Sequence, residues 1–323
     1  MSNVKLGIIG SNFVSDWLCD CVKVSAGIVN HAVYSRKDET GRAFADKHGI
    51  PHVYTDMEEF LSSDIDAVYI ASPNFLHYAQ AEAAMRHGKH VLVEKPAALT
   101  REDFESLEAI AREMGIVLLE AMRPAHDVAM NEVKESLGKI GTVRRAVFEY
   151  CQYSSRYDKF KAGEVLNAFD PKMGNAAIMD IGIYPLHCCV IFFGEPRGVY
   201  AKSVKLHNGF EGMGSVFLDY GDVQTEVIYS KIADSVNPSV IMGEDGSVTI
   251  GKLSTVESVT LCPRKGEAKE LIGNRDGNNM VYEIADFVKM IRGEMSPDKF
   301  NEITRITLGI VDEVRGQNGI EFK

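Results

Sequence analysis

Three side chains that can move protons lie close together in the segment 179–187 of this 323-residue chain, MDIGIYPLH. Asp180, Tyr184 and His187 recur at offsets of four and seven, so an α-helix would place them on one face. A carboxylate, a phenol and an imidazole on one face are the groups of a proton-transfer site. Structural roles are the alternative: Asp180 as a cap, Tyr184 at an interface and His187 in the core. For His187, one turn beyond Tyr184, we favour the structural role.

A second group of polar residues follows two apolar runs in the first third of the chain, 65–71 (IDAVYIA) and 90–93 (HVLV). The group consists of Ser72, Asn74, His77, Glu94 and Lys95. Open α/β sheets bind ligands just beyond the carboxyl ends of their strands. Lys95 leaves its run directly before a proline, a place unsuited to a mobile surface lysine. A plain surface ion pair between Glu94 and Lys95 is the structural alternative.

The turn at residues 10–15 (GSNFVS) follows the apolar run 4–9 and opens a helical stretch. A dinucleotide fingerprint reads G-x-G-x-x-G, and only its first glycine, Gly10, is present. Asn12 stands at the second position, and asparagine tolerates a positive φ better than most residues. Ser11 or Asn12 can cap the helix, whose N-terminus offers N–H groups to a phosphate. The turn from Gly10 through Ser11, Asn12, Phe13 and Val14 is thus either a pyrophosphate site or an ordinary strand–turn–helix connection.

The end of the second predicted strand carries Ser35, Arg36 and Lys37. A site for NAD usually places an acid here to bind the ribose 2′-hydroxyl, whereas an arginine accommodates the 2′-phosphate of NADP. No acid precedes Asp38, so the sequence favours NADP over NAD. An ordinary solvated basic loop is the alternative.

Strands and helices alternate over the first 120 residues. Near-continuous apolar runs at 4–9, 31–34, 65–71, 90–93 and 116–119 are separated by helical stretches that include 38–48, 77–86 and 101–114. Buried runs of this kind indicate a parallel sheet covered on both faces. We therefore predict an N-terminal Rossmann domain, a doubly wound parallel α/β sheet, over residues 1–120.

The chain changes character beyond residue 120. Period-two runs joined by turn residues occur at 142–150, 198–207, 215–221, 223–230, 239–246 and 247–251. Helical stretches are predicted near 176–193, 281–292 and 301–315. These patterns predict a second α/β domain over residues 121–323, with a large, mostly antiparallel open sheet and helices on one face.

Charge and composition narrow the partners. There are 35 basic and 46 acidic side chains, a formal charge of −11, and no basic run longer than two residues. Binding to nucleic acid needs clustered Lys and Arg, so we expect no nucleic-acid partner. The start has no signal-peptide pattern and the apolar patch 186–193 is too short to cross a bilayer, so we expect a cytoplasmic protein with no membrane partner. We expect no metal site, since the consecutive residues His187, Cys188 and Cys189 would point in different directions.

Four segments together resemble the glucose–fructose oxidoreductase / inositol dehydrogenase / MocA superfamily over nearly the whole chain. They are GIIG at 7–10, DAVYIASPNFLH at 66–77, GKHVLVEKP at 88–96 and MDIGIYPLH at 179–187. The resemblance implies that a Rossmann domain binds NAD(P) and that the second sheet mediates assembly into a homodimer or homotetramer. It places Lys95 at the nicotinamide and substrate, and Asp180 and Tyr184 on the substrate side. Arg123, which loosely matches the family's arginine after a strand, is a cofactor-side candidate.

Tyr184 stands where inositol dehydrogenases carry a histidine, so the chain is more similar to the branch with xylose and dihydrodiol dehydrogenases. The resemblance implies hydride transfer between NADP and a secondary alcohol or lactol carbon of a sugar, polyol or cyclic diol. Tyr184 would be the acid/base, assisted by the ammonium of Lys95, and Asp180 would orient the substrate hydroxyls. Alternatives are a non-catalytic dinucleotide-binding regulator and a glycosidase that retains its NAD. Asn12, and Gly174-Asn175-Ala176 in place of a glycine triplet, depart from the family pattern.

Overall fold

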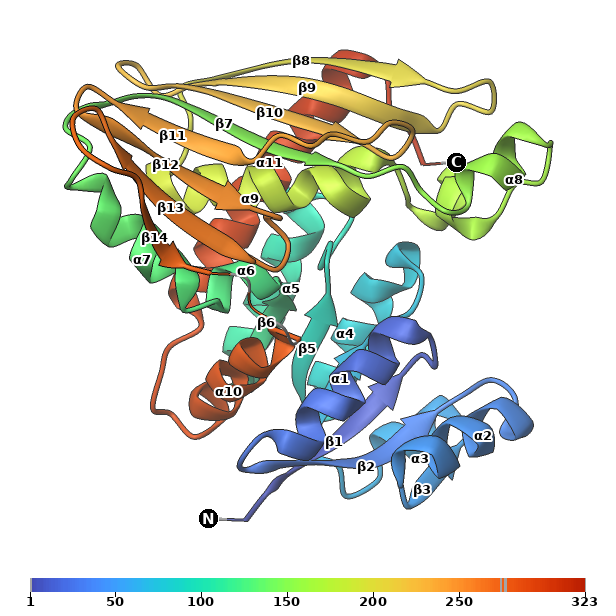
Figure 1. Ribbon diagram of the computed structural model, residues 1–323. Coiled ribbons are helices and arrows are strands. Elements are labelled where there is room, and N and C mark those ends of the chain that lie inside the picture. The colour runs from blue at the N-terminus through green and yellow to red at the C-terminus, as the bar shows by residue number, and fades with distance from the viewer. Residues whose placement is uncertain (1, 274, 276–277, 323) are drawn as a thin grey trace. The chain divides into compact units, whose positions relative to one another are not determined.

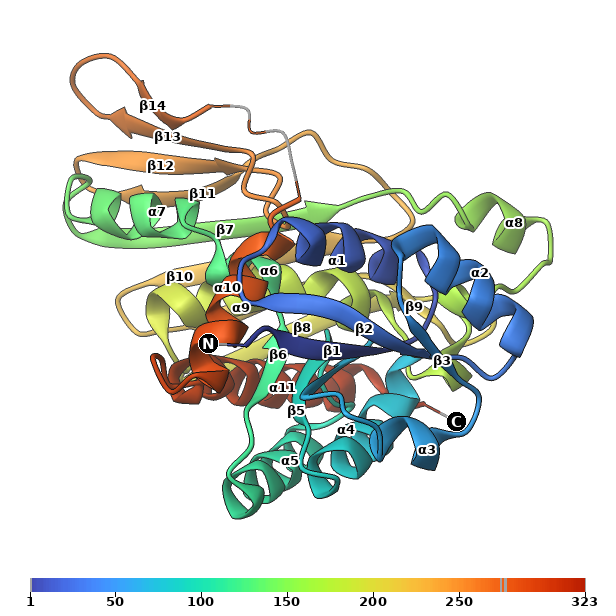
Figure 2. The same cartoon turned by 90° about the horizontal axis from the view of Figure 1, so that it is seen from below.

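The computed structural model describes residues 2–273, 275 and 278–322. The chain forms two compact units. The first consists of Met1–Met122 and Asn278–Glu302, and the second of Arg123–Gly277 and Ile303–Lys323. Each unit has its own sheet, labelled in Figure 1 and seen from below in Figure 2.

The first unit is built on a six-stranded parallel sheet with the order β3-β2-β1-β4-β5-β6. Its strands are β1 (Val4–Ile9), β2 (Ile28–Tyr34), β3 (His52–Tyr54), β4 (Ala67–Ile70), β5 (His90–Glu94) and β6 (Leu118–Ala121). All residues of β4 and β6 are buried, as expected when helices cover both faces of a sheet. The order is that of a dinucleotide-binding fold. The predicted Rossmann fold, a doubly wound parallel sheet, is confirmed.

Helices connect these strands. They are α1 (Phe13–Val24), α2 (Asp38–His48), α3 (Met57–Leu61), α4 (His77–Arg86), α5 (Arg101–Met114) and α10 (Met280–Ile291). Gly49 and Gly115, both in the left-handed conformation, end α2 and α5 at the predicted residues. The late helix α10 packs against α1 (Figure 2), with Ile284 and Phe287 buried in the same core as Leu18.

The second unit is built on an eight-stranded sheet with the order β14-β13-β12-β11-β7-β10-β9-β8. Its strands are β7 (Val143–Cys151), β8 (Gly198–Lys205), β9 (Glu211–Asp219), β10 (Gln224–Ser230), β11 (Ser239–Gly243), β12 (Gly246–Gly251), β13 (Ser258–Pro263) and β14 (Lys269–Ile272). Strands β7 and β10 pair in parallel, and the other neighbours pair antiparallel. This confirms the predicted mostly antiparallel sheet.

Helices gather on one face of this second sheet (Figure 1). They include α7 (Ala129–Leu137), α9 (Ile183–Phe193) and α11 (Asp298–Asn318); α6 (Arg123–His126) and α8 (Tyr157–Lys161) are shorter. The stretch Pro171–Phe193 is long and apolar enough to cross a membrane, yet 78% of its most apolar window is buried within the unit. Burial of that extent is typical of a core helix, and α9 packs directly on β7 and β10.

One predicted element is wrong in its geometry. The expected continuous α-helix over 176–193 instead begins with a π-helix, Ile178–Gly182, which passes into α9. Asp180 lies in the π-helix and Tyr184 in the first turn of α9, so the spacing of a regular α-helix does not describe how they are placed. A π-helix is rare and often marks a functional site.

Candidate active site

The carboxyl ends of the parallel strands in the first unit carry the residues predicted to bind a dinucleotide. The strand order reverses between β1 and β4, and ligands bind such sheets in the crevice at this reversal. Gly10 follows β1, Ser72 follows β4, and Glu94 ends β5. Arg36 follows β2 and is exposed.

Gly10 and Asn12 shape the loop after β1. Gly10 has a φ of +103°, and a Cβ there would lie 2.6 Å from the carbonyl oxygen of Ala71, so the loop admits only glycine at this point. Asn12 has a φ of −96°, so the positive φ that we considered for it is not used. Its Nδ2 donates to the Ala71 carbonyl at 2.7 Å, and its Oδ1 accepts from the backbone N–H of Val14 and Ser15 at 2.9 and 3.2 Å. Asn12 therefore caps α1 and ties the loop to the end of β4.

This loop fits a dinucleotide phosphate. A helix N-terminus presents backbone N–H groups and the positive end of the helix dipole to an anion. Here the N–H groups of Val14 and Ser15 donate to Asn12, so a phosphate would meet the residues before them. Because Gly10 has no side chain, its backbone can lie close to Ala71. Asn12 replaces the second glycine of the fingerprint without blocking the turn, because its side chain is used for capping.

The loop after β2 fits a phosphate better than a ribose hydroxyl. The Ser35 hydroxyl donates to the carbonyl of Lys37 at 3.0 Å, which shapes the turn that exposes Arg36. Asp38 is the first acid after β2, and its carboxylate accepts a hydrogen bond from Arg42 Nε at 2.7 Å. The acid that could accept from a 2′-hydroxyl is thus engaged elsewhere, while Arg36 is exposed.

The segment that carries Lys95 is fixed on both sides. The Tyr69 hydroxyl donates to Glu94 Oε1 at 2.6 Å, and the N–H of Ala97 donates to Glu120 Oε1 at 2.9 Å. Glu120 is buried at the end of β6. Burial and the Glu94 carboxylate raise the pKa of Tyr69 well above its usual value, so Tyr69 remains a neutral donor. The residues on both sides of Lys95 are therefore held by hydrogen bonds.

His77 links this segment to the loop after β4. The histidine is buried, with Nδ1 2.8 Å from the carbonyl oxygen of Pro96 and Nε2 2.9 Å from that of Ser72. Burial lowers the pKa of His77 even though the two carbonyls oppose the shift. The Ser72 hydroxyl donates to Gln80, and Asn74 begins the short 3₁₀ helix Asn74–Leu76 before α4. The structure thus places His77 as a brace between two loops at the dinucleotide edge.

In the second unit, Tyr184 is surrounded by an arginine and a tyrosine. Arg123, at the start of α6, directs Nη2 to the Tyr184 hydroxyl at 3.4 Å. The ring of Tyr150 meets that of Tyr184 edge to face, with centroids 5.7 Å apart. Only 6% of Tyr184 is exposed, while 36% of the Asp180 side chain remains accessible. His187 is 1% exposed. Arg123, predicted on the cofactor side, thus lies beside the candidate acid/base.

Two residues of the second sheet contact the two ends of the π-helix. The ring of Tyr229 occupies the space beside Gly182, where a Cβ would lie 2.9 Å from the ring. The Tyr229 hydroxyl donates to Glu211 Oε1 at 2.7 Å, and Glu211 Oε2 accepts from the N–H of Ile178 at 2.9 Å. Burial raises the pKa of Glu211, whose hydrogen bonds partly offset the shift. The pair therefore holds both ends of the π-helix that carries Asp180.

Lys231 is a further site residue that the sequence did not reveal. It follows β10 and lies 2.7 Å from Asp180 through Nζ and Oδ2. A lysine at the end of a strand looks like an ordinary surface residue. The only signal in the sequence is the alternation of β10. Every second side chain, such as Val227 and Tyr229, is buried, and position 231 continues this series. Among the residues that the structure describes, no group of three or more His, Cys, Asp or Glu side chains could hold a metal ion.

A parallel sheet of dinucleotide-binding order and a second unit with an acid and a phenol at the start of one helix define a class: two-domain oxidoreductases that use a nicotinamide dinucleotide. Two family models match the chain. Residues 4–121 match the oxidoreductase family with an NAD-binding Rossmann fold, and residues 132–249 match the GFO/IDH/MocA C-terminal domain. The chain belongs to the GFO/IDH/MocA family of oxidoreductases, as the sequence motifs predicted.

Two relatives support this assignment, and a solved structure has a similar fold. The chain is 40% identical over 322 residues to scyllo-inositol 2-dehydrogenase (NADP(+)) IolU of Bacillus subtilis, covering 99% of this chain and 98% of that protein. It is 37% identical to the uncharacterized oxidoreductase YgjR of Escherichia coli, with the same coverage of each chain. The fold is similar to that of KijD10, a 3-ketoreductase from Actinomadura kijaniata, solved with NADP and TDP-benzene. That match has a TM-score of 0.86 and 21% identity over 98% of both chains.

Proposed function

We propose that this protein is an NADP-dependent dehydrogenase that oxidises a secondary alcohol or lactol carbon of a sugar, polyol or cyclic diol, reversibly. The observation that carries the proposal is that two neighbouring side chains are held in place. Tyr184, in the first turn of α9, accepts a hydrogen bond from Arg123, and Asp180, in the preceding π-helix, is held by a buried lysine. A fixed carboxylate suits the binding of a polyhydroxylated substrate. The 40% identity to a scyllo-inositol 2-dehydrogenase supports the same substrate class.

The cofactor-binding residues follow from the loops at the carboxyl ends of the first sheet. Gly10, Ser11, Asn12, Phe13 and Val14 would hold the pyrophosphate at the start of α1, and Ser35 and Arg36 would hold the 2′-phosphate. The remaining proposed contacts come from Ser72, Asn74, His77, Glu94 and Lys95. When bound, the cofactor supplies a nicotinamide C4 that accepts hydride. NADP is favoured over NAD because Arg36 is exposed and Asp38 is bonded to Arg42.

Tyr184 would accept the proton of the reacting substrate hydroxyl. In the oxidation direction the Tyr184 phenolate takes the proton of the reacting hydroxyl and becomes the neutral phenol. The N–H that Arg123 directs to its oxygen would stabilise the phenolate needed for this step. The ammonium of Lys95 would polarise the substrate oxygen and add to that stabilisation. Asp180 would accept hydrogen bonds from neighbouring substrate hydroxyls and so fix which carbon reacts.

A reduction screen tests the proposal. Purified protein is mixed with inositols, hexoses, pentoses and aromatic dihydrodiols, with NADP and NAD in parallel, and formation of the reduced cofactor is followed by absorbance. We expect turnover with a polyol or sugar and a clear preference for NADP. A preference of about twofold or less would contradict the role of Arg36, since losing a charge-assisted phosphate contact should cost about 1.5–3 kcal/mol.

Substitution of Tyr184 tests the mechanism separately. Tyr184→Phe and Lys95→Ala should each lower kcat by about 10²–10⁴-fold, the usual contribution of a general acid/base, with NADP affinity largely kept. Tyr282→Phe, in α10, is the matched control and should leave kcat unchanged. Near-normal kcat in Tyr184→Phe would show that Tyr184 is not the base.

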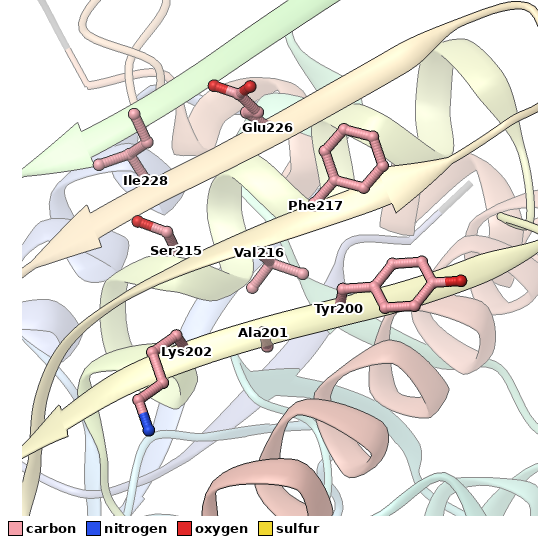
Figure 3. A pocket seen from close by; sticks show the side chains of 8 residues that line it. All are labelled: Tyr200, Ala201, Lys202, Ser215, Val216, Phe217, Glu226 and Ile228. Carbon is pink, nitrogen blue, oxygen red and sulfur yellow. The ribbon is translucent and has the colours of Figure 1, made fainter.

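The outward face of the second sheet supports assembly into a homodimer or homotetramer. A pocket of about 430 Å³ lies on β8, β9 and β10. Figure 3 shows side chains that line it, which include Tyr200, Phe217 and Ile228. Tyr200 is 63% exposed, and large exposed apolar patches mark interaction sites. Light scattering should give a mass above that of one chain, and Phe217→Arg should reduce it. A monomeric wild-type protein would refute this assembly.

We place the protein in the cytoplasm, where its six cysteines would stay reduced.

A further inference from the structure

Lys231 is almost completely buried, which is unusual for a lysine. It is 3% exposed and has three kinds of partner. Its Nζ lies 2.7 Å from Asp180 Oδ2, donates to the carbonyl oxygen of Ala168 at 2.9 Å, and lies 5.1 and 5.3 Å from the ring centroids of Phe169 and Phe210. Removing an ammonium group from water costs several kcal/mol, so its position must be closely determined by these partners.

The ion pair of Lys231 and Asp180 is asymmetric. Only 4% of the lysine side chain is accessible, whereas 36% of the Asp180 side chain is. A pair that served stability alone could be replaced by apolar residues at little cost. Here the buried cation instead holds a carboxylate that is partly accessible. The arrangement resembles the way a supporting residue fixes a ligand-binding group in a prepared site.

Lys231 also belongs to the group of residues that supports the π-helix. Tyr229, two residues earlier, packs against Gly182 and is bonded to Glu211, which holds the N–H of Ile178. Strand β10 pairs with β7 on one side and β9 on the other, so its register is fixed. The inward side chains of one strand thus hold both the backbone and the carboxylate of the turn around Asp180.

We infer that Lys231 is a positioning residue for the reaction, one that acts by fixing the carboxylate of Asp180 against the substrate hydroxyls. The inference rests on the proposed function. A misplacement of about 1 Å can cost about 10²-fold in rate. Lys231→Met should therefore lower kcat/KM by about 10²-fold, while Lys231→Arg, which keeps the cation, should retain more activity than Lys231→Met.

A double-mutant cycle separates positioning from general structural support. If Lys231 acts through Asp180, Lys231→Met should lower kcat/KM by less than about threefold in an Asp180→Asn background, since coupled residues are not additive. Equal losses in both backgrounds would overturn the inference. Lys269→Met, an exposed lysine of β14, is the matched control and should leave kcat/KM unchanged.

Chemical rescue tests the role of the cation directly. In Lys231→Ala, added methylammonium should restore part of kcat/KM, because the site left between Phe169 and Phe210 attracts a small cation. Tetramethylammonium at equal ionic strength, which has no N–H to donate, should restore less. Methylammonium should not rescue Asp180→Asn. Equal rescue by both salts, or rescue of Asp180→Asn, would contradict the inference.

Thermal denaturation keeps this test independent of the reaction. If the wild-type protein oxidises none of the compounds in the screen, the proposed function fails. The pairing of Lys231 with Asp180 is then judged by Tm alone. Lys231→Met and Asp180→Asn should lower Tm non-additively, because each removes the same contact. Additive changes would refute the pairing, and non-additive Tm with additive kcat/KM would refute the positioning role.

Discussion

Asn12 offers a quantitative test of how the cofactor loop is built. Asn12→Ala removes the cap on α1, which accepts from Val14 and Ser15, and the bond to the Ala71 carbonyl. Loss of an N-cap costs about 1 kcal/mol, and the second hydrogen bond contributes about another 1 kcal/mol. The free energy of unfolding should therefore fall by about 2 kcal/mol.

Thr100→Ala is the matched control in the same unit. The Thr100 hydroxyl caps α5 through a single bond from the N–H of Asp103 at 3.1 Å. This substitution should cost about 1 kcal/mol, about half the loss in Asn12→Ala. Urea unfolding, followed for both variants and the wild type under the same conditions, measures the difference.

NADPH binding separates the two caps further. Asn12→Ala loosens the loop proposed to hold the pyrophosphate, and a loss of about 1.4 kcal/mol there is a tenfold weaker Kd. Thr100→Ala should leave Kd unchanged, since α5 follows β5, which β4 separates from β1 and β2 in the sheet. A fluorescence titration with NADPH gives both values. Equal stability losses together with an unchanged Kd in Asn12→Ala would refute this account of the loop.

Three further predictions follow from single contacts. Gly10→Ala should weaken NADPH binding and stability more than Gly163→Ala, measured by titration and Tm: both glycines have positive φ, but a Cβ at position 163 meets nothing within 4 Å. Arg36→Ala should raise the KM for NADP by about tenfold or more and leave that for NAD nearly unchanged, as steady-state kinetics would show. Burial raises the pKa of Glu211 above 4.5, so the associated stability is present below pH 4.5 and is lost as the pH rises through the raised pKa. The Tm of Glu211→Gln should therefore rise relative to that of the wild type from about pH 4.5 upward. A difference in Tm that stays the same at every pH would contradict this prediction.

Much of the fold was predictable because the first sheet is buried on both faces. Burial requires continuous apolar runs, so β1, β4 and β5 appear in the sequence almost at their observed bounds. Strand β3 and helix α3 were missed since three and five residues are too short for a period to emerge. Strands β13 and β14 were also missed, because the sequence around them consists of polar turns that resemble one another. Nothing in the periodicity of α10 indicates which unit it packs on.

Of the candidate site, only the residues proposed to contact the substrate or cofactor were predictable from the sequence. Lys95, Asp180 and Tyr184 stand in recognisable motifs, but the groups that hold them do not. Glu120, Tyr229 and Lys231 act on partners that are distant in the sequence. Local patterns carry no information on such pairs. The π-helix was also missed, and its contacts with Tyr229 and Glu211 are likewise with residues distant in the sequence.

The alternation of β10 limits how this protein can change in length. Glu226 and Ile228 line the pocket on the outward face, whereas Tyr229 and Lys231 face the π-helix. Inserting or deleting one residue within the strand would exchange the two sets of side chains. Such a change would place Lys231 on the open face and would bring Ser230, after an insertion, or Ile232, after a deletion, beside Asp180. Homologous chains and engineered variants should therefore tolerate substitutions along the outer face of β10, but accept length changes only in the turn before it, at Tyr220–Val223.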